Sequence, residues 1–388
     1  MTLKIQLPNG SGTTVDYVLS GVPIALPSRP PTFNRFAYAA AHVVSDPLGD
    51  AQPWGKPAID WDATMAFRHH LWSLGFKIAE AMDTAQRGMG VDWTGAQELI
   101  RRSLAEARTF DGADLACGAG TDQLAPEDAR SLHDVIDAYE TQIGFVEVEG
   151  GRAVMMASRA LARVARTADD YRMVYGEILR QTGNRVVLHW LGDMFDPQLA
   201  GYWGSSSFEQ ALETVLAIIS DNKKKVEGIK ISLLDNAKEI ELRKRLPEGV
   251  LCFTGDDFNY AELIEGDGER YSHALLGIFD AVAPSASKAL AQLAKGETQA
   301  FRDVIEPTIP LSRKIFEAPT QYYKAGVVFL AWLNGHQSHF TMPAGMQSAR
   351  GIVHYAEVFR LADQANVLDK PELAVSRMKG LLQIYGIC

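Results

Sequence analysis

Hydrophobic and polar positions along the chain form two alternating patterns. Short runs of consecutive apolar residues, typical of strands buried in a parallel sheet, are separated by longer stretches in which apolar residues recur with the period of a helix. The apolar runs lie at 36–44, 76–82, 114–120, 153–157, 185–191, 226–234, 249–255 and 274–282. The helical patterns between and after them lie at 61–74, 94–108, 126–142, 168–180, 207–219, 237–246, 260–264 and 286–294.

This alternation predicts the fold class. Strands and helices that follow one another in turn are typical of a parallel sheet covered by helices. A regular spacing of this kind also occurs in solenoids, but solenoid units repeat their sequence, and these units are dissimilar. We therefore predict an α/β protein in which residues 35–296 form a (β/α)8 TIM barrel.

The two ends of the chain have other patterns. Residues 1–34 combine short apolar runs with a proline cluster, which predicts a small N-terminal β-rich arm. Residues 297–388 lack strand-like runs and predict a C-terminal helical extension packed on the barrel. The sequence does not indicate what these two segments do.

Amino-acid composition argues against several kinds of binding partner and structural framework. The 388 residues are 47% hydrophobic and 22% charged, with a net charge of −10. The only dense basic cluster is 223–225, which argues against a nucleic-acid partner. Three widely spaced cysteines exclude a disulfide framework or a zinc ribbon. Because the first residues lack the apolar segment of a signal peptide and no run is long enough to span a bilayer, we expect a cytoplasmic protein without a membrane partner.

Polar residues at the ends of the apolar runs are the candidates for chemistry, because the active site of a TIM barrel lies at the carboxyl ends of its strands. They follow or interrupt five of the eight runs. In chain order they are Glu80, Asp83, Thr84, Gln86, Arg87, Arg159, His189, Asp193, Lys230, Asp256 and Asp257.

Lys230 is the most unusual of these residues, because it interrupts a run, Gly-Ile-Lys-Ile, that should be buried on both faces. A buried ammonium group is unfavourable unless it is paired or loses its proton. Lys230 is therefore either ion-paired with a carboxylate such as Glu80 or Asp256, or a neutral amine that can form a Schiff base with a carbonyl compound. Periodicity alone does not separate the two.

Three segments in the second half of the chain have a recognisable spacing. Glu227-Gly-Ile-Lys230-Ile-Ser-Leu-Leu-Asp235 is followed by Thr254-Gly-Asp-Asp257 and by His273-Ala-Leu-Leu-Gly-Ile-Phe279. They resemble the G-[IV]-K, S-G-x-D and G-x-x-G-x-[IV] strands of the dihydrodipicolinate synthase and N-acetylneuraminate lyase superfamily. The resemblance extends faintly over roughly residues 35–340, and we identify the chain as a divergent branch of that superfamily. It implies a class I aldolase type of barrel, a Schiff-base role for Lys230, and a homodimer or homotetramer, for which the apolar stretch 329–332 would suit an interface.

The chain departs from the superfamily at two motifs. Where members that act on pyruvate carry a tyrosine and, five residues later, a carboxylate-binding arginine, this chain has His189 and Met194. Where they carry Gly-Thr-Thr-Gly-Glu, it keeps Thr84 and has Asp83 beside it. The usual arginine for pyruvate is thus missing, which favours a polyhydroxylated or sugar-derived carbonyl compound over a simple 2-keto acid, although Arg87 or Arg159 could still hold a carboxylate.

We expect a lyase or aldolase, or a dehydratase, in which four residues carry the reaction. Lys230 would attack the carbonyl, His189 and Thr84 would transfer protons, and Asp83 would act as a base or bind hydroxyl groups. Substrate contacts would come from Glu80, Gln86, Arg87, Arg159, Asp193, Asp256 and Asp257. This chemistry requires no cofactor.

Two other interpretations stay open. Glu80, His189, Asp193, Asp256 and Asp257 supply the oxygen and imidazole ligands that divalent metals prefer, so a metal-dependent lyase or isomerase of sugar derivatives is the first. A barrel that binds a small molecule without catalysis is the second, because fold does not fix function.

Overall fold

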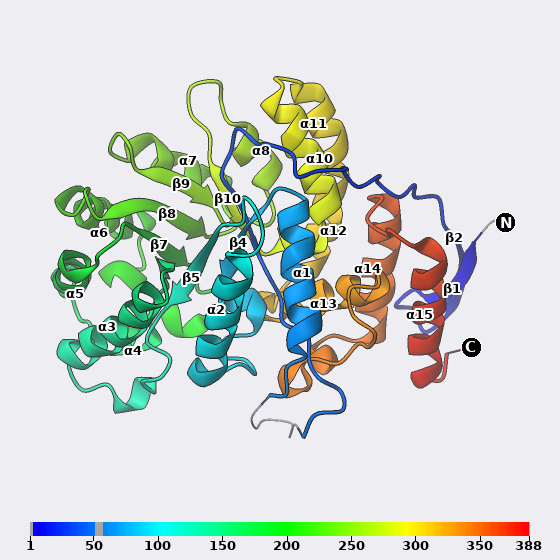
Figure 1. Cartoon of the computed structure of the whole chain (residues 1–388), viewed down its shortest axis with the longest axis horizontal. Coiled ribbons are helices and arrows are strands. Elements are labelled where there is room, and N and C mark those ends of the chain that lie inside the picture. Colours follow the sequence, from blue (N-terminus) through cyan, green and yellow to red (C-terminus); the bar gives the residue numbers. More distant parts are fainter. Residues whose placement is uncertain (1–2, 51–56, 388) are drawn as a thin grey trace.

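The computed structural model describes residues 3–50 and 57–387, and its centre is a closed barrel of eight parallel strands (Figure 1). Each strand pairs with its neighbours in chain order, and the last strand pairs with the first. Each predicted apolar run overlaps one strand, so the predicted TIM barrel is confirmed. The strands are β3 (Ala37–Ala40), β4 (Lys77–Glu80), β5 (Leu115–Ala119), β6 (Arg152–Met155), β7 (Val186–Leu191), β8 (Val226–Ser232), β9 (Leu251–Thr254) and β10 (His273–Leu276).

Helices cover the outside of the barrel (Figure 1). Their first turns are set by local chemistry: the carboxylates of Asp60 and Asp92, for example, accept hydrogen bonds from backbone N–H groups of the helices that follow them. These helices are α1 (Trp61–Ser73), α2 (Trp93–Ala107), α3 (Leu132–Val148), α4 (Arg159–Val164), α5 (Ala168–Gln181), α6 (Phe208–Asp221), α7 (Asn236–Arg245), α8 (Tyr260–Glu265), α9 (Ile278–Ala281) and α10 (Ala283–Ala294). The run 274–282 proves to be a strand followed by the short helix α9, because continuous apolar sequence does not separate a buried strand from a buried helical turn.

The C-terminal extension is helical, as the sequence predicts. It comprises α11 (Thr298–Ile305), α12 (Ile309–Ile315), α13 (Tyr323–Leu333), α14 (Ile352–Gln364) and α15 (Pro371–Ile384). Helix α13 packs against α9 of the barrel and is covered by α12, α14 and α15. Phe329, Leu330 and Ala331 on α13 are buried within the chain, and only Trp332 of the stretch 329–332 keeps part of its surface exposed. The homo-oligomer stays a prediction.

The N-terminal arm is a β-hairpin attached to the C-terminal helices. Strands β1 (Lys4–Pro8) and β2 (Thr14–Val18) pair antiparallel, and β1 packs on α14 and α15 (Figure 1). The Asp363 carboxylate accepts hydrogen bonds from Tyr17 Oη at 2.8 Å, from Ser20 N at 2.9 Å and from Gly21 N at 3.0 Å. The arm therefore joins the two ends of the sequence.

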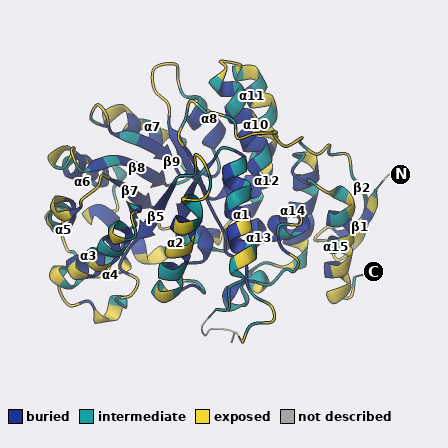
Figure 2. Cartoon of the chain, in the orientation of Figure 1, coloured by how far each residue is buried: buried dark blue, intermediate teal, exposed yellow. Residues whose placement is uncertain are grey.

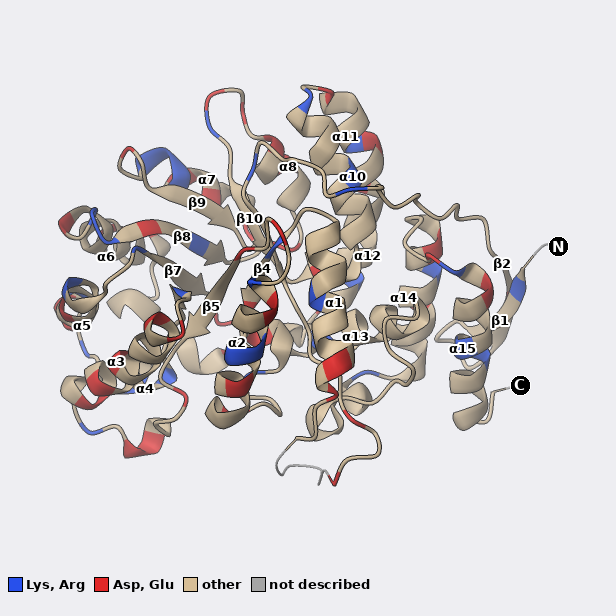
Figure 3. Ribbon diagram, viewed as in Figure 1, with Lys and Arg blue, Asp and Glu red and all other residues tan. Residues whose placement is uncertain are grey.

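The barrel strands differ from the helices and loops around them in burial and in charge. The barrel strands are mostly buried (Figure 2), and most charged residues lie on the helices and loops around them (Figure 3). At the amino ends of the strands, Arg152 donates hydrogen bonds to Asp114 at 2.8 Å, to Glu227 at 3.2 Å and to Tyr38 at 2.7 Å. These hydrogen bonds close the barrel at the amino ends of its strands, which we call the lower end. In the described part of the chain, no helix has the length and apolar character needed to cross a membrane.

Candidate active site at the barrel mouth

Lys230 lies on the interior face of β8. In register it stands between His189 on β7 and Phe253 on β9, and Phe253 belongs to the cluster of side chains that fills the barrel. The lysine is only 8% exposed. Among the described residues, no carboxylate lies within ion-pair distance, 4.0 Å, of its ammonium group, so neither Glu80 nor Asp256 pairs with it.

The environment of Lys230 favours the neutral amine. Burial lowers the pKa of Lys230, and the carboxyl groups of Asp83 and Asp257 raise it by a smaller amount. Burial also raises the pKa of Asp257 to about 7, while the N–H of Ile278 and the charge of Lys230 oppose this. A nearby carboxyl group that is itself partly protonated at neutral pH compensates the lysine only weakly.

His189 is the polar neighbour of Lys230 on β7. Its Nε2 lies 3.3 Å from Oγ of Ser232, and its Nδ1 is buried without a hydrogen-bond partner in the described chain. Burial and then the charge of Lys230 hold the pKa of His189 well below its ordinary value, so its imidazole is neutral at pH 7. A neutral imidazole with one unoccupied nitrogen can exchange a hydrogen bond with a bound molecule.

Gly255 gives Lys230 the space it occupies. A Cβ atom at this position would stand 2.1 Å from Oγ of Ser232 and 2.7 Å from Cε of Lys230. Both distances are shorter than van der Waals contact, so a side chain here would displace the lysine.

A cavity of about 350 Å³ opens at the carboxyl ends of the strands. Among the predicted candidates, it is lined by Asp83, Arg87, Arg159 and His189. Asp196 also lines it and pairs with Arg159 at 2.5 Å. The structure thus brings these candidates to one end of the barrel.

The C-terminal extension contributes to the same end. Oη of Tyr323 on α13 lies 2.8 Å from Oγ1 of Thr84, which is only 1% exposed. Burial, followed by the charge of Asp83, raises the pKa of Tyr323 well above its ordinary value, so the phenol keeps its proton. Sequence reasoning missed Tyr323 and its neighbour Lys324, although a lysine within the apolar stretch Tyr-Lys-Ala-Gly-Val-Val is the same signal that singled out Lys230.

Arg87 and Gln86 hold the loop after β4 in place. Both carboxylate oxygens of Asp122 accept from the Arg87 guanidinium, at 2.7 and 3.0 Å, and the carbonyl oxygen of Gly118 accepts at 2.6 Å. The Gln86 amide donates to the carbonyl oxygen of Pro343 at 3.0 Å. Arg87 borders the cavity, but its donors are occupied by the protein.

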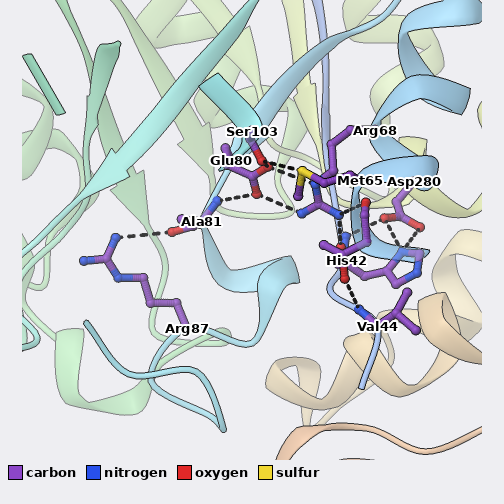
Figure 4. A network of polar contacts seen from close by, with 10 residues as sticks. His42, Val44, Met65, Arg68, Glu80, Ala81, Arg87, Ser103 and Asp280 are labelled. Atoms are coloured by element: carbon purple, nitrogen blue, oxygen red, sulfur yellow. Dashed lines mark hydrogen bonds and ion pairs between the residues drawn. The ribbon is translucent and has the colours of Figure 1, made fainter. Parts of the chain in front are cut away.

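Glu80 is not among the residues that line the cavity, and its side chain points toward Arg68 and Ser103 and away from Arg87 (Figure 4). Its carboxylate pairs with Arg68 through two hydrogen bonds of 2.8 and 2.9 Å and accepts another from Ser103 at 2.5 Å. Arg68 and Glu80 are fully buried. Side chains alternate along a strand, and in β4 it is Ala79 that faces the interior. We had placed Glu80 among the substrate contacts, and the structure instead gives it a partner in the helical layer.

Two other predicted contacts also lie elsewhere. Asp193 is exposed and borders a separate surface pocket, and Asp196 is the acid of this loop that reaches the cavity. Asp256 accepts hydrogen bonds from the backbone N–H groups of Phe258 and Asn259, at 2.8 and 3.0 Å, and so shapes the turn after β9. The residues suggested as metal ligands do not converge: within residues 3–50 and 57–387, no three His, Cys, Asp or Glu side chains are arranged to hold one metal ion.

Comparison with known proteins identifies the family and the fold. A family model described as "Protein of unknown function (DUF993)" matches residues 5–387. No curated protein matches the sequence.

Solved structures with the same fold are dihydrodipicolinate synthases and their relatives. The enzyme from Aquifex aeolicus has 11% identity and a TM-score of 0.59, over 91% of this chain and 98% of its own. A putative dihydrodipicolinate synthetase from Pseudomonas aeruginosa has 13% identity and a TM-score of 0.64, over 86% and 100%. YagE, a prophage protein of the dihydrodipicolinic acid synthase family from E. coli K12, solved in complex with pyruvate, has 11% identity and a TM-score of 0.62, over 92% and 100%.

At these identities the likeness establishes the fold, which confirms the fold implied by the segments around Lys230. The match to the family model covers almost the whole chain. The chain belongs to the DUF993 family, and its barrel has the fold of the dihydrodipicolinate synthases.

Proposed function

We propose that this protein is a lyase of the class I aldolase type, which forms a Schiff base between Lys230 and a small carbonyl compound. The observation that carries the proposal is the state of Lys230: a buried amine at the barrel mouth with no carboxylate within 4.0 Å among the described residues. Desolvation of this kind lowers the pKa of a lysine and so raises the share of the neutral amine, which is the form that attacks carbonyl carbon.

The reaction would begin with attack of the Lys230 nitrogen on the carbonyl carbon, which gives a carbinolamine. The carbinolamine loses water to give the protonated imine, and this group accepts the electron pair when the neighbouring carbon–carbon bond breaks or when a hydroxyl group leaves. Hydrolysis of the imine then returns the lysine and releases the product.

His189, the neighbour of Lys230 on β7, and a pair of hydroxyl groups from the loop after β4 and from α13 can move the protons. The unoccupied Nδ1 of His189 can accept a proton from the carbinolamine and return it to the departing water. The hydroxyl pair of Thr84 and Tyr323, 2.8 Å apart, offers a second path. Asp83 lines the cavity and can bind substrate hydroxyl groups.

The substrate is a keto acid or a sugar-derived carbonyl compound. The pyruvate complex of YagE makes pyruvate the first compound to test. Met194, at the position that the resemblance assigns to the carboxylate-binding arginine, is exposed, so any carboxylate would need another partner here.

The test is reduction with borohydride in the presence of pyruvate, hydroxyacetone, dihydroxyacetone and dihydroxyacetone phosphate, followed by intact and peptide mass spectrometry. We expect one adduct per chain, located on Lys230 and absent from Lys230→Met. The control is Lys225→Met, because Lys225 donates to a backbone carbonyl oxygen at the opposite end of the barrel. An adduct on other lysines only, or no adduct from any of the four compounds, would contradict the proposal.

A further inference from the structure

Ser232 is the polar group that contacts the imidazole ring of His189. The register of β7 and β8 pairs His189 with Lys230 and Leu191 with Ser232, so Lys230 and Ser232 lie on the same face of β8. His189 is 1% exposed and Ser232 is 2% exposed. Nε2 of His189 and Oγ of Ser232 lie 3.3 Å apart, and within the described chain neither side chain has another hydrogen-bond partner. Among these residues, the hydroxyl group is therefore the one polar contact that orients the ring.

The turn after β9 leaves room for this pair. The N–H of Gly255 donates to the carbonyl oxygen of Ile231 at 2.8 Å, which brings Gly255 against β8. A Cβ atom at Gly255 would stand 2.1 Å from Oγ of Ser232 and 2.7 Å from Cε of Lys230, so the hydroxyl group and the end of the lysine border the same space. His189 also lines the cavity at the mouth. The pair therefore lies beside the amine that the proposed reaction uses.

Other buried histidines of the chain have partners that settle which ring nitrogen carries the proton. Nδ1 of His42 lies 2.8 Å from a carboxylate oxygen of Asp280, which can only accept, so this nitrogen donates. Nδ1 of His273 accepts from the backbone N–H of Phe36 at 2.9 Å. A hydroxyl group can either donate or accept. The contact of His189 with a serine therefore allows both tautomers of the ring.

The two tautomers of His189 leave different groups without a partner. Burial holds the pKa of His189 well below its ordinary value, so the ring is neutral at pH 7 and carries one proton. A proton on Nδ1 would be buried with no acceptor among the described residues, which is unfavourable. A proton on Nε2 is donated to Oγ of Ser232, and the serine proton, unlike a ring proton, can rotate toward another acceptor. The second arrangement is favoured, and it leaves Nδ1 with a free lone pair.

We propose that Ser232 is a positioning residue that accepts a hydrogen bond from Nε2–H of His189 and so keeps the lone pair of Nδ1 available as the base. This role rests on the proposed function. Nδ1 takes a proton from the protonated nitrogen of the carbinolamine and returns it to the hydroxyl group, which leaves as water while the nitrogen lone pair forms the protonated imine. Between these steps the ring is an imidazolium ion, and its hydrogen bond to Ser232 becomes charge-assisted, which stabilises it.

NMR of the full chain, labelled in histidine with the heavy nitrogen isotope, tests the tautomer without any substrate. Protonated and unprotonated ring nitrogens have well separated resonances, and the pair that disappears in His189→Gln belongs to His189. At pH 7 we expect a protonated Nε2 and an unprotonated Nδ1 in the wild type. In Ser232→Ala, which lacks the acceptor, we expect the proton to move to Nδ1 in a large share of the molecules.

The matched control is Ser287→Ala, because the buried hydroxyl group of Ser287 donates to the carbonyl oxygen of Leu74 at 2.7 Å and does not contact His189. This variant should keep the tautomer of the wild type. A proton on Nδ1 in the wild type, or an unchanged Nε2–H form in Ser232→Ala, would overturn the inference.

The rate of borohydride trapping at Lys230 tests the effect on the reaction. The reductant is in excess, so that imine formation limits the rate, and the probes are those of the four carbonyl compounds that the wild type traps. Ser232→Ala should lower the maximal rate roughly tenfold to hundredfold, because general acid–base catalysis has at least this magnitude. The probe concentration for the half-maximal rate should stay within about twofold of the wild type, since Ser232 acts through His189. Ser232→Thr, which keeps the hydroxyl group, should recover most of the rate.

The two measurements separate this role from the proposed function. A wild-type rate in Ser232→Ala, or an equally slow rate in Ser287→Ala, would overturn the role of Ser232 while leaving Schiff-base formation intact. If no probe is trapped at Lys230, the proposed function fails, and the NMR comparison still decides whether Ser232 sets the tautomer of His189.

Discussion

Cations have different surroundings at the two ends of the barrel. At the lower end, the guanidinium of Arg152 meets the carboxylates of Asp114 and Glu227. At the mouth, Lys230 and Lys324 are more deeply buried, and neither meets a carboxylate within 4.0 Å in the described chain. The ion pairs at the lower end therefore stabilise the fold. The cations at the mouth lack such a partner, which a bound ligand could supply.

The helical layer shows that burial alone does not make this difference. Arg68 is fully buried, yet Glu80 holds it with two hydrogen bonds and Thr64 accepts another at 3.1 Å (Figure 4). A buried cation that is paired with a carboxylate and fully hydrogen-bonded usually has a structural role. A buried cation without them marks a candidate functional site.

The largest effect is expected at Lys230. Lys230→Met should abolish borohydride trapping, a loss of about a thousandfold or more, because methionine has no nucleophilic nitrogen. Its free energy of unfolding should stay within about 1 kcal/mol of the wild type, since no ion pair is broken. Urea unfolding and mass spectrometry measure the two quantities, and a loss of several kcal/mol would show that Lys230 has a structural partner.

The opposite outcome is expected for Arg68. Arg68→Met leaves the Glu80 carboxylate buried without its cation, which should lower the free energy of unfolding by about 3–5 kcal/mol. Trapping at Lys230 in the protein that remains folded should be unchanged. If Arg68→Met lost as much trapping as Lys230→Met, the distinction between a structural Arg68 and a reactive Lys230 would be wrong.

A smaller effect is expected at Gly255. Gly255→Ala places a methyl group against Cε of Lys230 and Oγ of Ser232, and the resulting shift of the amine should slow trapping roughly tenfold to hundredfold. The control is Gly144→Ala, because a Cβ atom at Gly144 would meet no atom within 4 Å; this variant should be trapped at the wild-type rate. Trapping by Gly255→Ala at the wild-type rate would mean that Lys230 reacts from another position.

An effect of a different kind, a change of stability with pH, depends on Asp257. Its pKa is about 7 in the folded protein, against 3.8 ordinarily, so the folded chain holds the proton that the unfolded chain has lost. The wild type should therefore lose stability relative to Asp257→Asn as the pH rises from about 4 to about 7, by at most about 1.4 kcal/mol per unit, and the difference should be constant above that. Urea unfolding at several pH values measures it, and parallel curves would show that Asp257 is ionised throughout.

The fold was predictable from the sequence because a closed parallel barrel imposes one repeated signal, an apolar run followed by a helical pattern. Lys230 was predictable for the same reason, since a charge within such a run stands out. Glu80 was misplaced because the sequence does not reveal which of two alternating positions on a short strand faces inward.

The rest of the site depends on contacts between distant segments. Tyr323 meets Thr84 across more than half the chain, and no local periodicity predicts that helix α13 contributes to the barrel mouth. Lys324 carries a signal in its apolar surroundings, but only the fold shows that its side chain is buried.

The central claim is that Lys230 is a buried amine without a counter-ion. Competitive acetylation across pH, with the extent of labelling of each lysine measured by peptide mass spectrometry, gives the pKa of Lys230 beside that of the exposed Lys288 in the same sample. The account predicts that Lys230 titrates at a lower pH than Lys288. A midpoint for Lys230 equal to or above that of Lys288 would show a stabilised ammonium ion, and would contradict both its isolation and its role as the nucleophile.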